Sequence, residues 1–259
     1  PEDGVIIIKN PKTYAPVPGS SIDLNNLFNP NMNYNPNTGS FMASVGSSPN
    51  TITPSPDFLA SPFGSVYNKL VSQNNSFLCL LDKYNPSKKL SLNLIYSEIQ
   101  NNDIKNFDAQ TTSTYINGVL SKVSIQFDPS KVITTITRDN LINTYERSEI
   151  GKATDIIHEA LHAYSTANNI PTGANHNVFN EYRDLMISTL LEYNSDNKLG
   201  FTYNQINELA YKGTTNSTEF STYIQTLANT NKTSYNTELA NYDKRLSDLN
   251  WSLISTKTN

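Results

Sequence analysis

The sequence predicts an α+β protein in which a small, mostly antiparallel sheet is followed by a mainly helical C-terminal half. Two patterns support this. Strand-like runs bounded by turn residues occur between residues 90 and 137, and from about residue 147 onward apolar residues recur at helical spacing. Strands followed by helices are the usual order in an α+β fold. With 259 residues, 37 % of them hydrophobic, the chain can bury a sizeable core.

The N-terminal segment has a different composition from the rest. Ten of the thirteen prolines lie at or before Pro62, and residues 13–56 contain a single charged residue, Asp23. Such a segment buries too little apolar surface to offset its conformational entropy. We therefore expect residues 1–60 to be a Pro/Asn/Ser-rich extended arm or linker and residues 61–259 to form the folded domain.

The folded domain is expected to begin with helices. Residues 61–84 start at a Ser-Pro pair and predict two helical segments that meet at Asn74 and Asn75. The strands that follow are predicted at 90–99, 114–129 and 131–137. The middle run predicts a hairpin that turns at Asn117-Gly118, with residues 121–127 as a candidate edge strand.

The C-terminal half is expected to be helical throughout. Trp251, the only tryptophan, is expected to pack within the last helix. The predicted helices cover residues 151–168, 176–194, 203–212, 218–229 and 234–254.

Composition excludes several classes of partner. The net charge is −4, only 16 % of residues are charged, and no basic cluster could neutralise phosphates, so nucleic acid is not a predicted partner. No apolar run, including the one at residues 5–8, approaches the roughly 18 residues that a membrane span needs. Cys79 is the only cysteine, which excludes an intrachain disulfide. Low charge with abundant Asn, Ser, Thr and Tyr predicts a secreted or cell-surface protein, and the oligomeric state is not predicted.

The stretch "ATDIIHEALHAYS", residues 153–165, carries the chemistry. His158 and His162 are four positions apart, so a helix places both on one face, and Glu159 follows the first of them. Composition predicts on the order of 0.001 chance occurrences of this H-E-x-x-H pattern in the chain. The surrounding apolar residues predict a buried helix, in which two imidazoles without a ligand would each need a hydrogen-bond partner. A metal site is therefore favoured over a helix that merely carries two histidines.

Zinc is the metal that fits this pattern best. Imidazole is a good zinc ligand, and a site with three protein ligands leaves the fourth position open for water. Glu159 lies about 100° round the helix from His158, where it can act as the general base toward such a water. Asp155 and Asp184 could each accept the second N–H of a ligand histidine, although a surface charge is the favoured interpretation of both.

Two residues compete for the role of third ligand. His176 follows His162 by 14 residues and Glu181 follows it by 19. If residues 176–194 form a helix, the mean direction of its apolar residues lies roughly 85° from His176 and roughly 135° from Glu181. His176 is therefore the favoured third ligand, and Glu181 is the alternative.

Two known metallopeptidase patterns fit the chain poorly. The metzincin pattern requires Gly and His where this chain has Ser165 and Asn168, so that family is excluded. The thermolysin-like pattern places a ligand glutamate about 20 residues after the second histidine. Glu181, between Asn180 and Asp184, comes within one residue of that spacing and keeps the alternative open.

A third group matches more of the chain. The stretches "ATDIIHEALHAY" (153–164), "HNVFNEYRDLMISTLLEY" (176–193) and "SPFGSVYNKLVSQNNSFLCLLDKY" (61–84) resemble a group of zincin-like metallopeptidases of Bacteroidota. This resemblance covers residues 61–195 and implies a zincin-like fold, a bacterial source, peptidase chemistry and His176 as the third zinc ligand. Asn177 departs from the Glu that is frequent in that group, and the resemblance implies no particular substrate.

Three functions remain as hypotheses. The leading one is a zinc metallopeptidase that hydrolyses peptide bonds of a protein or peptide substrate, with His158, His162 and His176 as ligands and Glu159 as general base. The second is a hydrolase domain acting as a toxin or effector at the C-terminal end of a larger secreted protein. The third is a non-catalytic binding module braced by zinc, which would need a fourth protein ligand.

Overall fold

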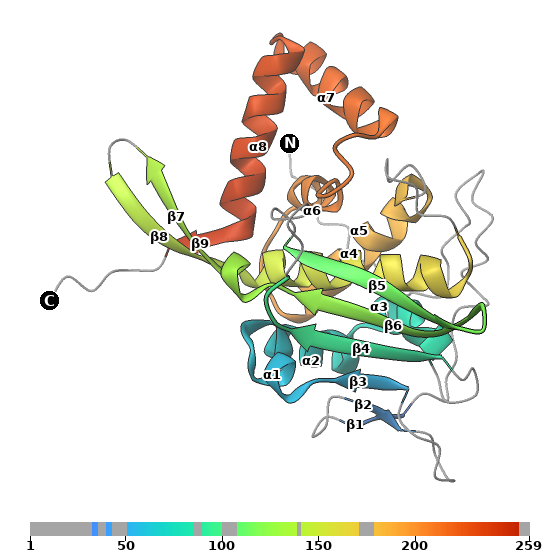
Figure 1. The fold of residues 1–259 in the computed structure, drawn as a ribbon. Helices are drawn as coiled ribbons and strands as arrows, with labels where there is room; N and C mark the ends of the chain where they lie inside the picture. Colours follow the sequence, from blue (N-terminus) through green and yellow to red (C-terminus); the bar gives the residue numbers. More distant parts are fainter. Residues whose placement is uncertain are drawn as a thin grey trace, which may run out of the picture.

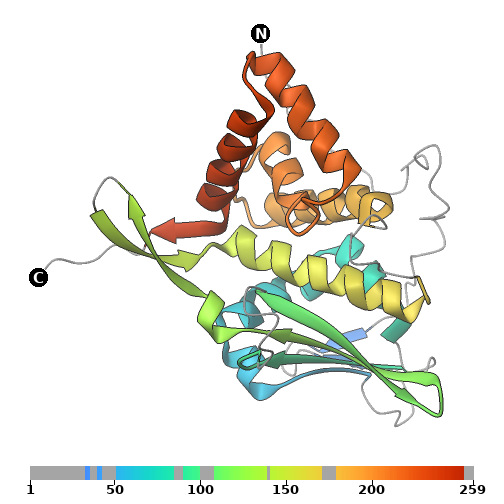
Figure 2. The same ribbon diagram turned by 45° about the horizontal axis from the view of Figure 1, so that its top comes forward.

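The computed structural model describes residues 33–35, 40–42, 51–84, 90–99, 108–138, 141–170 and 179–253. Helix α4 (Glu149–Ala167) is the centre of the fold. One side of it contacts the sheet strands β5 (Ala109–Ile116) and β6 (Val119–Phe127), together with α2 (Pro62–Gln73) and α3 (Asn75–Leu81). Helices α5 (Phe179–Asp196), α6 (Tyr203–Ala210) and α8 (Tyr235–Asn250) contact it from another side (Figures 1 and 2). The predicted α+β class is confirmed.

The main sheet is mixed rather than mostly antiparallel. Its order is β3-β4-β6-β5, with β3 at Ile52–Pro54 and β4 at Ser91–Tyr96, and both β3–β4 and β4–β6 are parallel pairs. Parallel neighbours need a crossover connection, which the helices between β3 and β4 provide. The expected antiparallel pairing holds instead in a second sheet, formed by β7 (Ile133–Arg138), β8 (Leu141–Arg147) and β9 (Trp251–Leu253). A short antiparallel pair, β1 (Asn33–Asn35) and β2 (Ser40–Met42), completes the strands.

The folded domain begins earlier than Ser61, the predicted boundary. Ile52 in β3 and Phe58 in α1 (Pro56–Ala60) are fully buried, and the Phe58 ring lies 5.4 Å from that of Phe127. The prolines in this stretch are compatible with order, because Pro56 occupies the first position of a helix that Ser55 caps. Residues 51–60 are therefore part of the domain. The rest of the proposed arm, apart from β1 and β2, lies outside the described residues.

The predicted break between the first two long helices is confirmed at Asn74. The Asn74 side chain caps α3 by accepting a hydrogen bond from the Phe77 N–H at 2.7 Å, and its amide donates to the Thr189 carbonyl at 2.8 Å. A single asparagine thus ends α2, starts α3 and ties both to α5.

The hairpin at Asn117-Gly118 is also confirmed, with φ of 50° and 77° at the two residues. Two positive φ values are what a tight hairpin turn requires, and Asn-Gly adopts them readily. The prediction of an edge strand within this hairpin was wrong. Strand β6 is paired on both sides, with β4 and with β5, and β5 is the edge strand of the described sheet.

The predicted C-terminal helices are present, and the last one is shorter than expected. Helix α8 pairs with α7 (Thr218–Asn231) as a helical hairpin that projects from the domain (Figure 2). It ends at Asn250 because Trp251–Leu253 pair with β8 as strand β9. Trp251 thus lies in a strand, with the Arg147 guanidinium 5.0 Å above its ring. The sequence also missed β8 itself.

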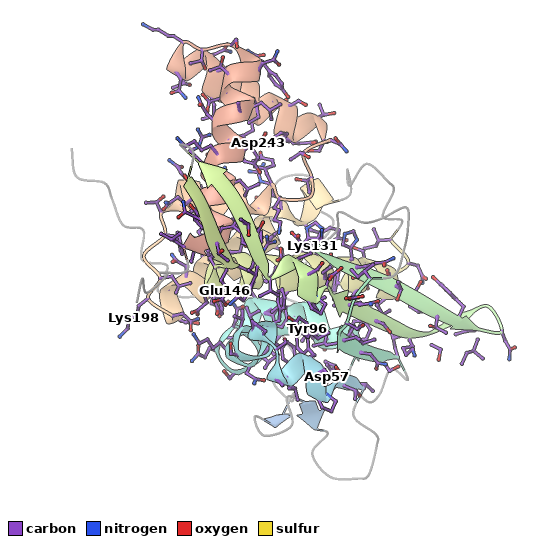
Figure 3. All side chains as sticks on the ribbon, turned by 60° about the vertical axis from the view of Figure 1, so that its left-hand side comes forward. Asp57, Tyr96, Lys131, Glu146, Lys198 and Asp243 are labelled. Atoms are coloured by element: carbon purple, nitrogen blue, oxygen red, sulfur yellow. The ribbon has the colours of Figure 1, made fainter. Side chains whose placement is uncertain are left out.

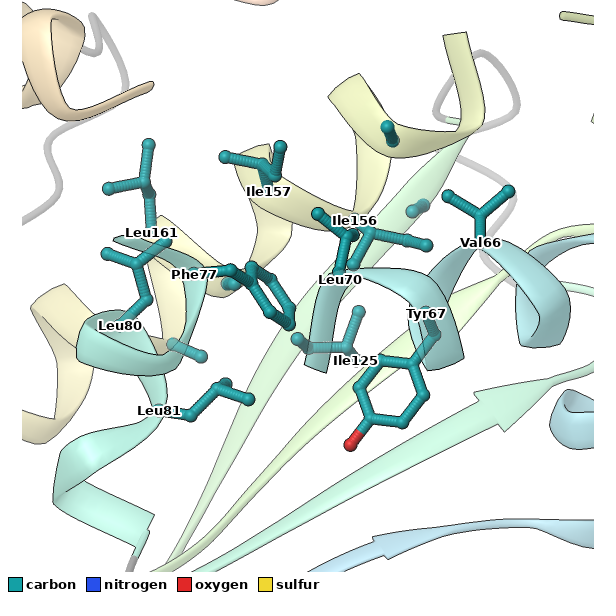
Figure 4. Packing of buried hydrophobic residues seen from close by; sticks show 14 of the residues in the cluster. Val66, Tyr67, Leu70, Phe77, Leu80, Leu81, Ile125, Ile156, Ile157 and Leu161 are labelled. Carbon is teal, nitrogen blue, oxygen red and sulfur yellow. The ribbon is translucent and has the colours of Figure 1, made fainter. Parts of the chain in front are cut away.

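The predicted burial of the H-E-x-x-H helix is confirmed. Ile156, Ile157 and Leu161 of α4 are at most 1 % exposed and belong to the same hydrophobic cluster as buried residues of α2 and α3, part of which Figure 4 draws. The Tyr84 hydroxyl donates to the Ala163 carbonyl at 2.7 Å near the end of the helix. Helix α4 is thus packed on most of its circumference, and His158 and His162 are among its partly exposed residues.

Charged side chains are dispersed over the surface. Figure 3 labels Asp57 on α1, Glu146 on β8, Lys198 after α5 and Asp243 on α8, which lie on separate parts of the molecule. Within the described part of the chain, no helix combines the length and apolar character that crossing a bilayer would take.

Candidate metal centre

The start of α4 fixes the orientation of the site. Ser148 caps the helix by accepting a hydrogen bond from the Gly151 N–H at 3.0 Å, and the Ser148 hydroxyl donates to the Leu249 carbonyl at 2.6 Å. Glu149, in the first turn, places a negative charge at the positive end of the helix dipole. The helix is therefore anchored to strand β8 before it and to α8 across from it.

Three of the residues predicted for the site come together as expected. One potential ligand atom from each of His158, Glu159 and His162 lies within 4.8 Å of the others. The Nε2 atoms of the two histidines are 3.2 Å apart, close enough for one ring to donate to the other. Two nitrogens bound tetrahedrally at zinc distances would be about 3.4 Å apart. The observed spacing therefore fits a shared ion with little movement of either ring.

Glu159 differs from an ordinary surface carboxylate. Its side chain is 7 % exposed and accepts a hydrogen bond from the Thr111 hydroxyl of β5 at 2.6 Å. Burial raises its pKa to about 7, with Asp155 adding to the increase, while the Thr111 hydrogen bond and Lys212 act in the opposite direction. A carboxyl group that titrates near neutrality can both accept and return a proton at physiological pH.

A close backbone contact shapes the wall opposite the His158 ring. Gly213 has φ of +79°, and a Cβ at this position would lie 2.7 Å from Cε1 and 3.1 Å from Nε2 of His158. Only glycine allows the turn after α6 to approach the imidazole so closely. Gly213 therefore helps to fix the ring on the face of α4 that carries both histidines.

Four charged residues beside the site form a closed cluster. Arg147 donates to Asp155 from Nε at 2.9 Å and from Nη2 at 2.6 Å, and its Nη2 also contacts Asp108 at 2.6 Å. Lys212 donates to Asp108 at 2.7 Å and to Asp155. The cluster has two positive and two negative charges, and it joins β8, the start of β5, α4 and the turn that carries Gly213.

The interpretation of Asp155 as a surface charge was wrong. Its side chain is only 5 % exposed and its oxygens bond to Arg147 and Lys212. Asp155 precedes His158 by three residues, so the cluster supports the histidine-bearing turn of α4. Asp184, by contrast, is exposed, as expected.

The third ligand stays a prediction. His176 lies outside the described residues. Glu181 falls in the first turn of α5, where the structure describes its backbone and not its side chain.

Several neighbours of the site had no signal in the sequence. Thr111 is one of many threonines, and Gly213 looks like any glycine in a loop. The four members of the charge cluster span more than 100 positions of the chain, from Asp108 to Lys212, so no local pattern connects them. Their roles depend on tertiary contacts alone.

Comparison of the chain with protein-family models, curated proteins and solved structures finds no match. The functional argument therefore depends on the site itself.

Proposed function

We propose that this chain is a zinc metallopeptidase that hydrolyses peptide bonds of a protein or peptide substrate. The observation that carries the proposal is the group of His158, Glu159 and His162, whose ligand atoms lie within 4.8 Å of one another on one helix. A secreted or cell-surface location, expected from composition, is part of the same proposal.

The chain's own residues supply the metal ligands. His158 and His162 would hold the ion through their Nε2 atoms, with His176 as the proposed third ligand and Glu181 as the alternative. Bound zinc supplies a Lewis acid and lowers the pKa of its water ligand toward roughly 7. The zincin-like fold remains part of the proposal, supported by the order of sheet and helix around the motif.

Glu159 is the proposed general base. Its buried carboxylate, with a pKa of about 7, is suited to take a proton from the attacking water and pass it to the leaving amine. Thr111 holds one carboxylate oxygen at 2.6 Å, which leaves the other oxygen, Oε1, for the proton. Strand β5, through Thr111, and helix α4 thus together position the Glu159 carboxylate.

A metal that only braces the fold is a weaker explanation. A closed structural site needs a fourth protein ligand. Within the described chain, the carboxylate that joins the two histidines is Glu159, which already accepts a hydrogen bond from Thr111. A buried carboxyl held in this way beside two imidazoles fits a proton acceptor better than a structural ligand.

The test begins with metal content, measured by elemental analysis on protein purified without added metal. We expect about one zinc per chain in the wild type. Loss of zinc in His176→Ala with retention in Glu181→Ala would identify the three-histidine site, and the reverse would identify the glutamate ligand. Absence of metal from every protein would exclude the proposal.

Glu159→Gln separates catalysis from metal binding. The amide keeps the size of the side chain and removes its basicity, so we expect unchanged zinc content and a fall in peptide hydrolysis of about 100- to 10,000-fold. The assay uses a denatured protein or a mixed peptide library, with cleavage read by mass spectrometry. A fully active Glu159→Gln protein would contradict the role of general base.

A further inference from the structure

An open, shallow cavity of about 390 Å³ lies between the start of α5 and the first turns of α7. One part of its wall is aromatic: the rings of Tyr211 and Tyr223 are stacked with centroids 4.8 Å apart. Arg183 of α5 reaches the same wall, donates from Nη1 to the Tyr211 hydroxyl and places its guanidinium 4.6 Å above the Tyr211 ring. Tyr211 is only 2 % exposed, so the Tyr223 ring forms the accessible aromatic part of this wall, beside one cation.

Arg183 differs from the other two arginines whose side chains the structure describes. Arg147 bonds to two carboxylates, Asp108 and Asp155, and Arg245 bonds to Glu208 and Glu238. Within the described chain, no carboxylate lies within ion-pair distance of Arg183, and its Nε is buried without a hydrogen-bond acceptor. A half-buried guanidinium has lost part of its hydration, and its planar donors match a carboxylate.

The surroundings of Arg183 favour the binding of an anion, and they determine which other groups can donate hydrogen bonds to that anion. Helix α7 begins at Thr218, so the positive end of its dipole lies at the cavity. The Thr222 hydroxyl already donates to the Thr218 carbonyl at 2.9 Å and is not a donor to a ligand. Glu219, the one carboxylate of the wall, is exposed and would compete with a bound anion. The Thr226 hydroxyl likewise donates to the Thr222 carbonyl at 2.8 Å, so the side-chain donors left for a ligand are those of Arg183 and Thr218.

We infer that this cavity binds a carboxylate carried on an apolar body. Arg183 holds the carboxylate, and the partly exposed ring of Tyr223, which stacks on the buried ring of Tyr211, packs against the rest of the ligand. Two sources share this chemistry, the C-terminal carboxylate of a peptide and an acidic side chain within one.

The cavity adjoins the proposed metal centre. Tyr211 lies two residues before Gly213, which contacts the His158 ring, and the Thr214 N–H donates to the Tyr211 carbonyl at 3.0 Å. The same turn therefore borders both. The role of the cavity as a substrate subsite rests on the proposed hydrolase function, whereas its ability to bind a carboxylate does not.

Four small probes test the inference by NMR titration of the full-length chain, before and after EDTA treatment. The first pair is N-acetyl-phenylalanine and its amide, and the second pair is the α-amides of N-acetyl-glutamic acid and N-acetyl-glutamine. We expect at least one acid to bind about 10-fold or more tightly than its amide, because a charge-assisted hydrogen bond is lost in the amide. The pair that discriminates identifies the source, a C-terminal or a side-chain carboxylate. Equal binding of acid and amide in both pairs would overturn the inference.

Three variants locate the binding. Arg183→Gln should reduce the acid-over-amide preference to about 1, whereas Glu219→Gln should strengthen acid binding, since it removes the competing carboxylate. Lys244→Gln, at an exposed position on α8, makes the same change in net charge as Arg183→Gln and should bind like the wild type. A preference that survives Arg183→Gln would contradict the assignment. Binding that persists after EDTA has removed any metal does not depend on the metal centre. Such binding is assigned to the cavity even if the chain cleaves no peptide.

Discussion

The cluster around Asp155 and the cavity around Arg183 are two charged regions that flank the turn after α6, and they differ in completeness. In the cluster, two cations meet two carboxylates, with Arg147 and Asp155 buried and Asp108 and Lys212 partly exposed. In the cavity, the structure gives Arg183 a tyrosine hydroxyl and an aromatic ring as partners. A cluster in which every cation has a carboxylate partner stabilises the fold. A cation without such a partner is suited to binding an anionic ligand. The two regions therefore predict opposite responses to mutation.

The largest expected effect comes from opening the closed cluster. Asp155→Asn keeps the size of the side chain and leaves Arg147 and Lys212 to share one carboxylate, Asp108. Removing one partner of a buried ion pair costs about 3–5 kcal/mol of the free energy of unfolding. Urea unfolding of the metal-free protein measures this cost without a contribution from zinc affinity.

The control for this variant is Asp184→Asn on α5, which is exposed and should change the free energy of unfolding by less than about 0.5 kcal/mol. A loss below about 1 kcal/mol in Asp155→Asn would mean that the cluster does not stabilise the fold, and the contrast with the cavity would disappear.

Gly213→Ala tests the turn that the two regions share. The new Cβ would lie 2.7 Å from Cε1 of His158, so the ring or the turn must move. If His158 is a zinc ligand as proposed, displacing its ring should weaken zinc binding by about 10- to 100-fold, as the loss of supporting contacts usually does. Competition with a chromophoric chelator measures the affinity.

Gly200→Ala is the matched control. Gly200 has nearly the same φ, +78°, but a Cβ there meets nothing within 4 Å. Both variants carry the backbone strain of alanine at positive φ, and only Gly213→Ala disturbs the imidazole. Equal zinc affinity in the two variants would show that the contact with His158 is not needed to hold the ion.

The closed cluster also predicts how stability depends on pH. Burial alone would raise the pKa of Asp108, but Lys212 and Arg147 outweigh it and lower the pKa from 3.8 to about 2. Between these values the unfolded chain binds more protons than the folded one, so stability falls as the pH decreases. Asp108 should contribute about 2 kcal/mol that is present above pH 5 and lost toward pH 2. Urea unfolding at several pH values should show a shallower slope in Asp108→Asn, and an identical slope would contradict this assignment.

The sequence predicted the parts of the fold that depend on local pattern. The burial of α4 follows from apolar residues at helical spacing, the break at Asn74 from a capping side chain, and the hairpin from Asn117-Gly118. It failed where a partner far along the chain decides the structure. Trp251 is a strand residue only because β8 pairs with it, and residues 51–60 are ordered because Phe58 packs against Phe127.

The candidate site divides in the same way. His158, Glu159 and His162 could be predicted because one helical turn brings them together. Thr111 and Gly213 could not, since each reaches the motif from another element and neither residue type is distinctive. The parts of the site that tune its chemistry are therefore the parts that only the tertiary structure identifies.

Among the residues of the two regions, Arg183 should contribute least to stability, in contrast to Asp155. Within the described chain, Arg183 forms no ion pair with a carboxylate. Its removal in Arg183→Gln therefore leaves no buried charge unpaired. The variant loses one hydrogen bond to Tyr211 and the contact with its ring, which together should cost about 1 kcal/mol or less. The same urea unfolding series measures it. A cost near that of Asp155→Asn would mean that Arg183 is a structural residue like Arg147, whereas a small cost together with lost carboxylate binding would assign it to the ligand.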